Sequence, residues 1–442
     1  MELITDYKQQ EHLICKKHLP RFNGKWIIKQ IGDFTSCTAG GTPSTFIPTY
    51  WGGEFRWMNS GELHQKFVNE VEGKITQEGL RNSSTKLIPK KCVLVGLAGQ
   101  GKTRGTVAIN LVELCTNQSI AAIFPSPEHV PEYLYYNLEF RYDELRSFSS
   151  GEGGRGGLNL AIIESILVPL PEKPEQRAIA AALSDVDALI AALDRLIAKK
   201  RDNKQAAMQE LLTGKRRLPG FVCGNRSKQT DVGTIPADWD IITLGDLFTF
   251  KNGLNKGKEH FGYGTPIVNY MDVYKRSGIH AADINGRVSL SKQEIKTYEV
   301  HKGDVFFTRT SETTDEIGIA SVMLDDPKDT VFSGFVLRAR PRNDYLDDQF
   351  KKYCFSTNEV RRAIVSKSSY TTRALTNGHL LSIVTIPLPS IHEQHAIATV
   401  LSDMDAEIAA LETRRQKTLA LKQGMMQELL TGRIRLVKGA EA

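Results

Sequence analysis

Cysteine is scarce in this sequence, and no cysteine lies where a metal site or a disulfide framework would need it. The six cysteines among 442 residues form no Cys-x-x-Cys pair, a pattern typical of reduced thiols in the cytosol. No apolar run reaches the ~20 residues that span a bilayer, and the ten histidines show no His-Glu-x-x-His spacing. We therefore expect a cytoplasmic protein with no membrane segment and no metal site.

A strong charge of either sign is also lacking. The sequence has 57 Lys and Arg against 51 Asp and Glu, a net charge of +6. This surplus suits a polyanionic partner, but it is far from that of a histone-like tail. Charge alone therefore indicates nucleic acid only weakly, and the length predicts two to four domains.

What the chain does contain is an internal repeat. The segment PLPEKPEQRAIAAALSDVDALIAAL from Pro169 returns as PLPSIHEQHAIATVLSDMDAEIAAL from Pro387, at an offset of 218 residues. Held without gaps over 50 positions, this register gives 29 identities and ends in MQELLTGKRRL and MQELLTGRIRL. Chance does not produce such a match, so we interpret the chain as a tandem duplication.

The best-matched part of each repeat has the pattern of a long helix. Its apolar residues step by four and three, as in a coiled-coil stripe. Pro171 and Pro389 precede the stripes, and Gly214 and Gly432 follow them, as is usual at helix starts and ends. Each helix would run ~40 residues, or about 60 Å.

Because the two stripes match, we expect them to zip together within one molecule. The alternative is that each stripe packs only on its own domain. The residues predicted to pair the helices and to bind a partner are Leu183, Val186, Ile190, Leu193, Leu401, Met404, Ile408 and Leu411.

The segments ahead of the two helices predict mixed α/β lobes that differ strongly from each other. Short β-rich runs such as KCVLV, GTVAI, DVFFT and GIASVM are broken by Gly, Asn and Ser. The predicted boundaries are 1–168 for the first lobe, 169–214 for the first helix, 215–235 for a connector, 236–386 for the second lobe, 387–432 for the second helix and 433–442 for a tail.

One segment invites an enzymatic interpretation. Gly96–Thr103 matches the phosphate-binding pattern GxxxxGK[ST] in full. Such a loop needs a helix after it, whereas RGTVAI follows and favours a strand. The aligned loop of the second repeat, Arg309–Asp315, has no such pattern. We therefore expect a strand, a loop and a strand in both repeats, and keep an ATPase or nuclease using Gly96–Thr103 as the alternative function.

No catalytic centre is evident elsewhere. Gly151–Gly156 satisfies GxGxxG, but it follows no clear strand and lacks a ribose-binding acid in a βαβ unit. The sequence also has no Asn/Asp-Pro-Pro-Tyr/Phe tetrapeptide and no nuclease-like cluster of carboxylates and lysine. The chain is therefore predicted to be non-catalytic.

The same glycine-rich loops suit DNA as a ligand. Glycines allow close backbone approach, Lys and Arg neutralise phosphates or reach guanine, and Asn or Gln pairs with adenine. The predicted DNA-binding residues are Gln100, Lys102, Arg104, Arg155 and Asn159 in the first repeat, and Arg309, Thr310, Tyr370, Thr371, Arg373 and Asn377 in the second.

Two of these positions are common to both repeats. Arg155 aligns with Arg373, and Asn159 aligns with Asn377. Residues shared by two readers of different sequences cannot specify both, so a structural role at the helix entrance stays open for these four. Residues that differ between the repeats are the better candidates for specificity.

The pattern PLPxxxEQxxIAxxL, a long amphipathic helix and MQELLTGxxRL, present twice, resembles the specificity subunit of type I restriction-modification enzymes. The resemblance covers nearly the whole chain. It implies an α+β fold with a pseudo-twofold internal duplication: two α/β target-recognition domains separated by two long conserved helices that form an antiparallel coiled coil. Each domain would read one part of a bipartite DNA site, and the helices would act as a spacer.

The resemblance also implies partners. These are double-stranded DNA, methyltransferase subunits, expected in two copies on the helical region, and motor-nuclease subunits. S-adenosylmethionine, ATP and Mg belong to those partners, and none is expected in this chain. Two lobes related by a pseudo-dyad would meet DNA segments about a helical turn apart, and their divergence predicts an asymmetric site. A coiled-coil scaffold whose lobes bind protein is the third hypothesis.

Overall fold

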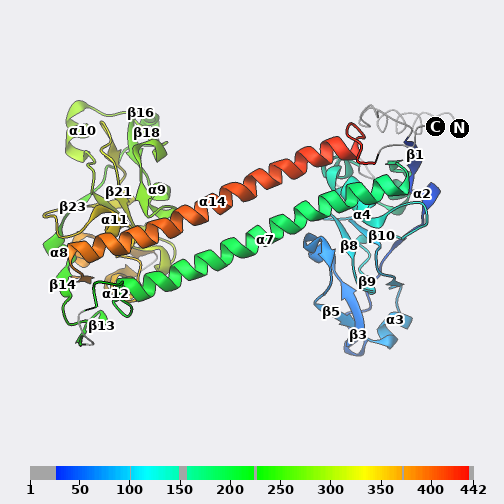
Figure 1. Cartoon of the computed structure of the whole chain (residues 1–442), viewed down its shortest axis with the longest axis horizontal. Helices are drawn as coiled ribbons and strands as arrows, with labels where there is room; N and C mark the ends of the chain where they lie inside the picture. Colours follow the sequence, from blue (N-terminus) through cyan, green and yellow to red (C-terminus); the bar gives the residue numbers. More distant parts are fainter. Residues whose placement is uncertain (1–25, 100, 149–156, 223–225, 371–372, 438–442) are drawn as a thin grey trace. The chain divides into compact units, whose positions relative to one another are not determined.

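The computed structural model describes residues 26–99, 101–148, 157–222, 226–370 and 373–437, which fall into two compact units. Unit 1 comprises residues 1–194 and 414–442, and unit 2 comprises Arg195–Thr413. Helices α7 (Lys173–Leu212) and α14 (Ile391–Leu430), of 40 residues each, begin in one unit and end in the other (Figure 1). Each unit therefore holds a lobe, the first part of one long helix and the last part of the other.

The lobe of unit 1 contains two larger sheets. The five-stranded sheet has the spatial order β2 (Cys37–Ala39), β10 (Ile120–Ile123), β7 (Val93–Gly96), β8 (Val107–Asn110) and β4 (Phe67–Val68). The four-stranded sheet has the order β5 (Gly73–Ile75), β3 (Trp51–Met58), β9 (Leu114–Thr116) and β6 (Leu87–Ile88). The short α-helices are α2 (Ile31–Phe34), α3 (Gln77–Arg81), α4 (Pro131–Phe140), α5 (Tyr142–Ser147) and α6 (Leu160–Ser165). Strands β7, β8 and β10 are buried along their whole length, which is why they read as unbroken apolar runs.

The lobe of unit 2 repeats this plan. Its five-stranded sheet has the order β15 (Phe248–Asn252), β23 (Val336–Pro341), β19 (Val305–Thr308), β21 (Ala320–Met323) and β17 (Gly278–Ile279). Two three-stranded sheets have the orders β18 (Arg287–Val288), β16 (Phe261–Val268), β22 (Val331–Phe332) and β20 (Thr310–Ser311), β25 (Ala374–Leu375), β24 (Ser369–Tyr370). The short α-helices are α8 (Leu244–Leu247), α9 (Tyr270–Tyr274), α10 (Lys292–Tyr298), α11 (Asp348–Lys351), α12 (Asn358–Lys367) and α13 (Gly378–Ser382).

The two lobes join their long helices in the same way. In unit 1, β1 (Ile27–Gln30) pairs antiparallel with β11 (Leu167–Leu170), which leads into α7. In unit 2, β14 (Asp240–Thr243) pairs antiparallel with β26 (Thr385–Leu388), which leads into α14. In both units, therefore, the strand that leads into the long helix pairs with a strand from the start of the lobe, as expected for an internal duplication.

The range assigned to a connector contains a hairpin. Strands β12 (Ser227–Thr230) and β13 (Gly233–Pro236) pair antiparallel around a turn in which Gly233 has φ +101°. Val232 and Ile235 are buried. The glycine and the charged residues suggested an irregular segment, whereas burial of these two apolar side chains stabilises a strand pair.

Both long helices lie within the predicted ranges 169–214 and 387–432, whose first residues belong instead to β11 and β26. Each starts two residues after its proline, Pro171 or Pro389. Beyond the last turns, Gly214 and Gly432 have φ +71° and +70°, the left-handed conformation that favours glycine at a helix C-terminus.

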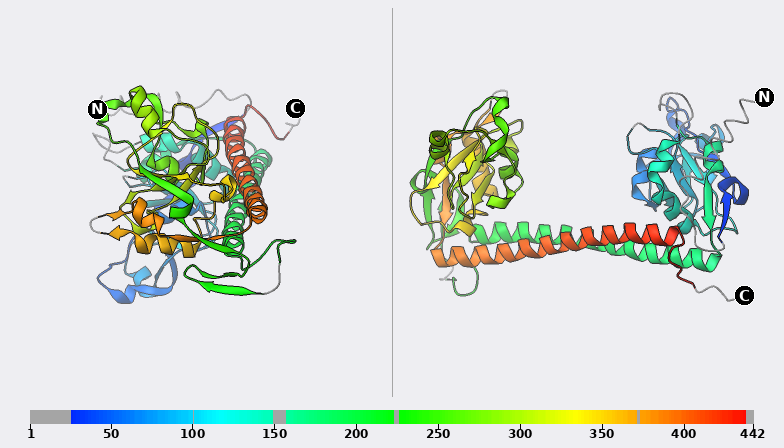
Figure 2. Two further views of the ribbon diagram at one scale, coloured as in Figure 1. Left: turned by 90° about the vertical axis from the view of Figure 1, so that its left-hand side faces the viewer. Right: turned by 90° about the horizontal axis from the view of Figure 1, so that it is seen from above.

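In each unit the two long helices lie side by side and run antiparallel (Figure 2). The core of unit 1 receives apolar side chains from both helices: Ile179, Leu183, Met426, Leu429 and Leu430. The core of unit 2 likewise receives Leu211, Leu212, Ile397, Ala398 and Leu401. The idea that each stripe packs only on its own domain is therefore wrong, because the end of each helix completes the core beneath the other lobe.

Candidate nucleic-acid interface

Gly96–Thr103, the segment of unit 1 that matches the phosphate-binding pattern, connects two neighbouring strands. Strands β7 and β8 pair antiparallel, with Val93 opposite Ile109. The chain passes from the loop through Gly105, at φ +77°, straight into β8. A phosphate-binding loop needs a helix at this point, so the geometry supports the expected strand, loop and strand and does not support an ATPase at Gly96–Thr103.

Helix α5 holds this loop through its backbone. The Tyr142 hydroxyl donates to the carbonyl oxygen of Lys102 at 2.9 Å, and Arg146 Nη1 donates to the carbonyl oxygen of Gly101 at 2.7 Å. The Lys102 side chain stays exposed, and Arg104 is half-buried. A loop whose backbone is fixed by hydrogen bonds and whose lysine side chain is exposed suits a phosphate contact.

The polar segment before α6 lies against the same loop. The backbone N–H of Leu158 donates to the carbonyl oxygen of Leu97 at 2.8 Å. Leu158, which follows the glycine-rich stretch in the sequence, therefore lies beside this loop. Gln100 and Arg155, also predicted to bind DNA, lie outside the described residues.

The two shared asparagines have the same local role. Asn159 Oδ1 accepts from the backbone N–H of Ile162 at 2.9 Å and caps α6. Asn377 Oδ1 accepts from the backbone N–H of Leu380 at 3.0 Å and caps α13. Such caps stabilise a helix by about 1 kcal/mol. This is the structural role left open for them, and their contact with DNA stays a prediction.

In unit 2 the loop between β19 and β21 is built against the segment before α13. The carbonyl oxygen of Arg309 accepts from the backbone N–H of Thr376 at 3.0 Å, and its own N–H donates to Phe335 O at 3.1 Å. Arg309 Nη1 reaches Gly334 O at 3.4 Å. The half-buried Arg309 is therefore fixed between two polar segments.

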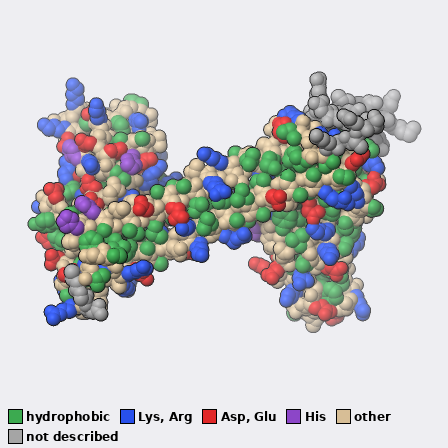
Figure 3. All heavy atoms as spheres, in the orientation of Figure 1, with side chains coloured by type: hydrophobic (Ala, Val, Ile, Leu, Met, Phe, Trp, Pro, Cys, Tyr) green, Lys and Arg blue, Asp and Glu red, His purple; other side chains and the backbone are tan. Residues whose placement is uncertain are grey.

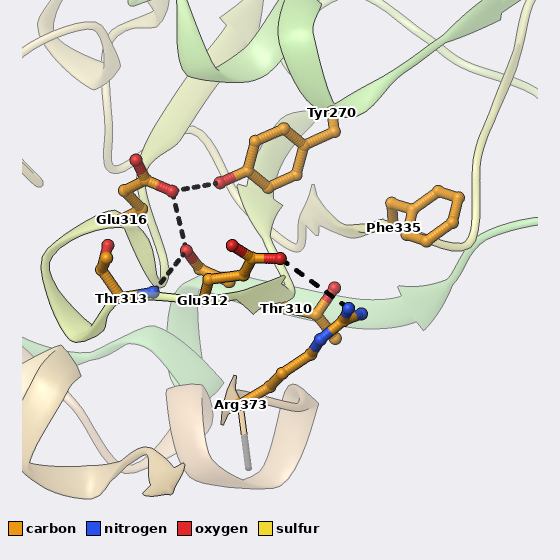
Figure 4. A pocket seen from close by; sticks show the side chains of 8 residues that line it. Tyr270, Thr310, Glu312, Thr313, Glu316, Phe335 and Arg373 are labelled. Carbon is orange, nitrogen blue, oxygen red and sulfur yellow. Dashed lines mark hydrogen bonds and ion pairs between the residues drawn. The ribbon is translucent and has the colours of Figure 1, made fainter.

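A cavity of about 350 Å³ opens at this junction (Figure 4). It is lined by Tyr270, Thr310, Ser311, Glu312, Thr313, Glu316, Phe335 and Arg373. On one side Glu316 accepts from Ser311 Oγ at 2.7 Å and from the hydroxyls of Tyr274 and Tyr270 at 3.1 and 3.3 Å. These bonds, that from Ser311 above all, hold the pKa of Glu316 below its ordinary value.

On the other side of the cavity stands an ion pair. Arg373 Nη2 lies 3.8 Å from Glu312 Oε1. Two of the predicted DNA-binding residues, Thr310 and Arg373, therefore line one cavity beside Arg309. Tyr370 lies in β24, next to the same segment, and Thr371 is outside the described residues.

Sequence reasoning assigned no role to the glutamate of the repeated Glu-Gln pair. In unit 1, Glu175 is buried and accepts from Arg435 Nε at 3.2 Å and from the backbone N–H groups of Leu436 and Val437 at 3.0 and 2.7 Å. The start of α7 is thereby bonded to the segment that follows α14.

Unit 2 contains the reciprocal arrangement. Glu393, at the start of α14, is buried and accepts from Arg217 Nε and Nη2 at 2.5 and 2.7 Å and from Trp239 Nε1 at 2.9 Å. The Arg217 guanidinium lies 5.5 Å from the Trp239 ring centroid, and that of Arg435 lies 5.6 Å from Trp26. Arg217 and Arg435 recur 218 residues apart near the end of the repeated segment, as Glu175 and Glu393 do near its start. This joint recurrence is the sequence signal that could have revealed the pairing of glutamate with arginine.

The glutamine next to each glutamate fastens the lobe to its helix. Gln176 accepts from the backbone N–H of Val130 at 2.7 Å and donates to Pro171 O at 2.8 Å. Gln394 accepts from the backbone N–H of Asp347 at 2.9 Å and donates to Tyr345 O at 2.8 Å. These buried amides explain why both repeats carry the Glu-Gln pair.

A charged cluster further along pairs the helices in unit 1. Lys422 of α14 lies 2.8 Å from Asp187 of α7 and 3.0 Å from Glu139 of α4, over the Tyr136 ring. The Tyr136 hydroxyl donates to Asp187 at 2.9 Å.

The same cluster recurs in unit 2 with the helices exchanged. Lys204 of α7 lies 2.5 Å from Asp405 of α14 and over the Tyr353 ring, whose hydroxyl donates to Asp405 at 2.7 Å. Lys204 and Lys422 are 218 residues apart, as are Asp187 and Asp405, so one antiparallel register serves both units.

The residues predicted to pair the helices face inward. Leu183, Ile190, Leu193, Leu401 and Ile408 are buried. Val186, Met404 and Leu411 are half-buried. Their burial leaves little surface for an outside partner, so a role in partner binding stays a prediction for them.

Neither a metal cluster nor a membrane span occurs in the part of the chain that the structure describes. Within it, no group of three or more His, Cys, Asp or Glu side chains is placed to hold a metal ion. None of its helices is long and apolar enough to cross a membrane.

Comparison with known proteins agrees with this architecture. The family model described as type I restriction modification DNA specificity domain matches residues 23–199 and 236–421. A type I restriction enzyme specificity subunit of Methanocaldococcus jannaschii, MjaVIII, is 22% identical over 441 residues, covering 99% of both chains.

Two solved structures share the fold. The S subunit of a type I restriction-modification system from M. genitalium has a TM-score of 0.54 at 16% identity, covering 93% of this chain and 96% of its own. A chain from work on complex assembly and conformational transition of the type I R-M system has a TM-score of 0.59 at 17% identity, covering 94% and 100%. With most of both repeats matched by the family model, this chain belongs to the type I restriction-modification DNA specificity family.

Proposed function

We propose that each unit reads one half of a bipartite, asymmetric sequence in double-stranded DNA, and that the paired helices hold the two readers in register. The observation that carries this proposal is that two lobes whose five-stranded sheets correspond strand for strand bear different polar loops at corresponding places. A shared scaffold with divergent loops is what a protein needs to read two different half-sites.

Within each lobe the contacts divide by chemistry. Lys102 is exposed on a pinned loop, which suits a phosphate. Arg104 and Arg309 are half-buried, and an arginine held in place can donate two hydrogen bonds to guanine. The proposed contact set is completed by further residues of the same segments: Gln100, Arg155, Asn159, Thr310, Tyr370, Thr371, Arg373 and Asn377.

The outer surface of the helix pair is the proposed platform for two methyltransferase subunits. Figure 3 shows hydrophobic side chains between charged ones along the helices. Leu189, Leu196 and Leu421 are 40%, 38% and 58% exposed, whereas the stripe that pairs the helices is buried. These leucines are not repeated at the offset of 218, where Glu407, Arg414 and Asn203 stand, so the two copies would share the scaffold of the helix pair but meet different side chains at these positions.

The chain itself would be non-catalytic, and it would act as the part of a methyltransferase and endonuclease complex that selects the DNA. S-adenosylmethionine, ATP and Mg would be bound by the methyltransferase and motor-nuclease subunits. The loop of Gly96–Thr103 would bind no nucleotide.

The test is an exchange of the second lobe. Residues 236–386 are replaced by the matching lobe of a relative, and the methylation motif of cells carrying the chimera is read by sequencing, with the methyltransferase partner unchanged. One half of the motif should change while the other half and the spacer stay the same. A change in both halves together, or in the spacer alone, would contradict independent reading.

A further inference from the structure

Glu312 and Arg373 form a pair that contributes little to the fold of unit 2. Their side chains are 86% and 68% exposed, and the closest nitrogen and oxygen are 3.8 Å apart. That separation is too long for a hydrogen bond, and exposed pairs of this kind add little stability. Both groups are therefore available for a ligand at the rim of the cavity of Figure 4.

The backbone nevertheless holds the two residues opposite each other. Strands β20 and β25 pair antiparallel, with Thr310 opposite Leu375 and Ser311 opposite Ala374. The next position in this register places Glu312 opposite Arg373. A carboxylate and a guanidinium are thus presented side by side by two segments remote in the sequence.

Glu316, the other glutamate of this loop, uses its carboxylate in hydrogen bonds within the protein, whereas Glu312 does not. Glu316 accepts hydrogen bonds from Ser311, Tyr270 and Tyr274. The Glu312 carboxylate, among the described residues, has only the loose contact with Arg373. Its exposure therefore has no structural explanation.

The corresponding loop of the first repeat has no acid. Between Gly96 and Thr106 its charged residues are Lys102 and Arg104 only. An exposed carboxylate near DNA is repelled by phosphates, so it is useful only where it accepts a hydrogen bond from a base. If this loop meets DNA, Glu312 is thus a candidate for a base contact that the first repeat does not have.

We propose that Glu312 and Arg373 together read one G·C pair in the half-site bound by unit 2. In the major groove, guanine presents two acceptors, O6 and N7, and the paired cytosine presents the N4 amino group as a donor. Arg373 supplies two parallel donors to guanine, and Glu312 accepts from cytosine N4. The inference rests on the proposed function. Arg373 has a counterpart in Arg155 and would supply the guanine contact, whereas Glu312 has none and is the residue of the pair that makes the contact specific to unit 2.

An A·T pair does not match the same two groups. Adenine places a donor beside its N7 acceptor, and thymine presents an acceptor and a methyl group. The arginine fork would meet the adenine amino group, and the glutamate would face thymine O4. The pair thus discriminates by repulsion as well as by attraction.

The experiment uses the full chain assembled with the methyltransferase subunits of its own cell, and duplexes that carry its methylation motif. Each guanine of the half-site assigned to unit 2 by the lobe exchange is replaced in turn by 7-deazaguanine, which lacks N7. One replacement removes one of the two hydrogen bonds to guanine and should weaken binding about 2- to 13-fold, roughly half the free energy of a bidentate contact. The same replacement should leave binding by Arg373→Gln unchanged.

A second variant isolates the carboxylate. Glu312→Gln should weaken the discrimination against A·T at the same position, because the neutral amide can donate to thymine O4, while Arg373 still favours guanine. Asp326→Asn removes the charge of another exposed acid of unit 2 and should keep the original motif. Two outcomes overturn the inference: a half-site without a G·C pair, or wild-type binding that is insensitive to 7-deazaguanine at every position. Either leaves the reading of half-sites by separate lobes intact, since that is decided by the lobe exchange.

Discussion

At the scale of residues, the long helices depend on two buried carboxylates. Glu175 and Glu393 are each 1% exposed, and each accepts hydrogen bonds from the segment that follows the other helix. A buried carboxylate is stable only when its hydrogen bonds are satisfied, so each glutamate requires the chain beyond the partner helix to be in place.

We expect Glu393→Ala to lower the free energy of unfolding by about 1 to 3 kcal/mol, since Arg217 keeps its pair with Asp238 but the buried Trp239 N–H loses its acceptor. Chemical denaturation of the full chain measures this. Glu412→Ala removes an exposed partner of Arg201 and should cost less than about 1 kcal/mol. Equal effects of the two changes would show that burial of Glu393 is unimportant.

A second prediction concerns pH. Burial alone would raise the pKa of Glu139, but Lys66 and Lys422 hold it below the ordinary value of 4.5. The folded pKa is therefore lower than the unfolded one, so its stabilising contribution is complete above the unfolded pKa and is lost as the pH falls through the folded pKa.

The variant Glu139→Gln should therefore be less stable than the wild type at neutral pH, and the difference should shrink below pH 4.5. Urea denaturation at a series of pH values measures both. Glu128→Gln, in an exposed pair with Lys29, is the control and should show little difference. A gap between Glu139→Gln and wild type that stays constant down to acid pH would refute the assignment.

At the scale of elements, apolar stripes bring the helices together and charged residues set their register. A coiled-coil stripe tolerates slips by one heptad, because each layer resembles the next. The pairs Lys204 with Asp405 and Lys422 with Asp187 match in one antiparallel register only. Each pair also receives a tyrosine hydroxyl from its lobe, so the lobe participates in setting the register.

We expect Lys204→Glu to destabilise unit 2 and the addition of Asp405→Lys to restore part of the loss. The coupling in a double-mutant cycle should lie between about 0.5 and 3 kcal/mol. Lys200 with Glu407, a more exposed pair of the same helices, serves as the comparison and should couple more weakly. Additive effects at Lys204 and Asp405 would mean that they do not determine the register.

At the scale of the whole molecule, the first repeat contains the apolar residues of α14 that are buried in the core of unit 1, and also the lysine and arginine that pair with Asp187 and Glu175. Met208, Leu211 and Leu212 are identical to Met426, Leu429 and Leu430 at the offset of 218, as are Lys204 and Arg217 to Lys422 and Arg435. A second copy of the first repeat can therefore supply what unit 1 receives from α14.

We accordingly predict that residues 1–218 alone form a symmetric homodimer, with α7 of one copy antiparallel to α7 of the other. Light scattering should give twice the mass of the fragment. Leu211→Lys, which places a charge in the shared core, should abolish the dimer. A well-folded monomer would contradict the prediction.

Much of this architecture was predictable because its signals are local. The prolines, glycines and heptads that specify α7 and α14 each act over a few residues, and so do the buried runs that became β7, β8 and β19. The absence of a helix after Gly96–Thr103 followed from such a pattern, and the duplication followed from comparison of the two halves. The antiparallel direction of the helix pair was implied by the resemblance to specificity subunits.

What the sequence alone determined is therefore the set of elements and their repetition. Only the tertiary structure decided which helix end completes which core, why Glu175 and Glu393 are buried, and that Glu312 lies opposite Arg373. These arrangements depend on contacts between segments remote along the chain, whose free energy arises only when both segments are buried or paired. A single sequence holds no local signal for such contacts, because each residue's partner is set by the fold and not by its neighbours.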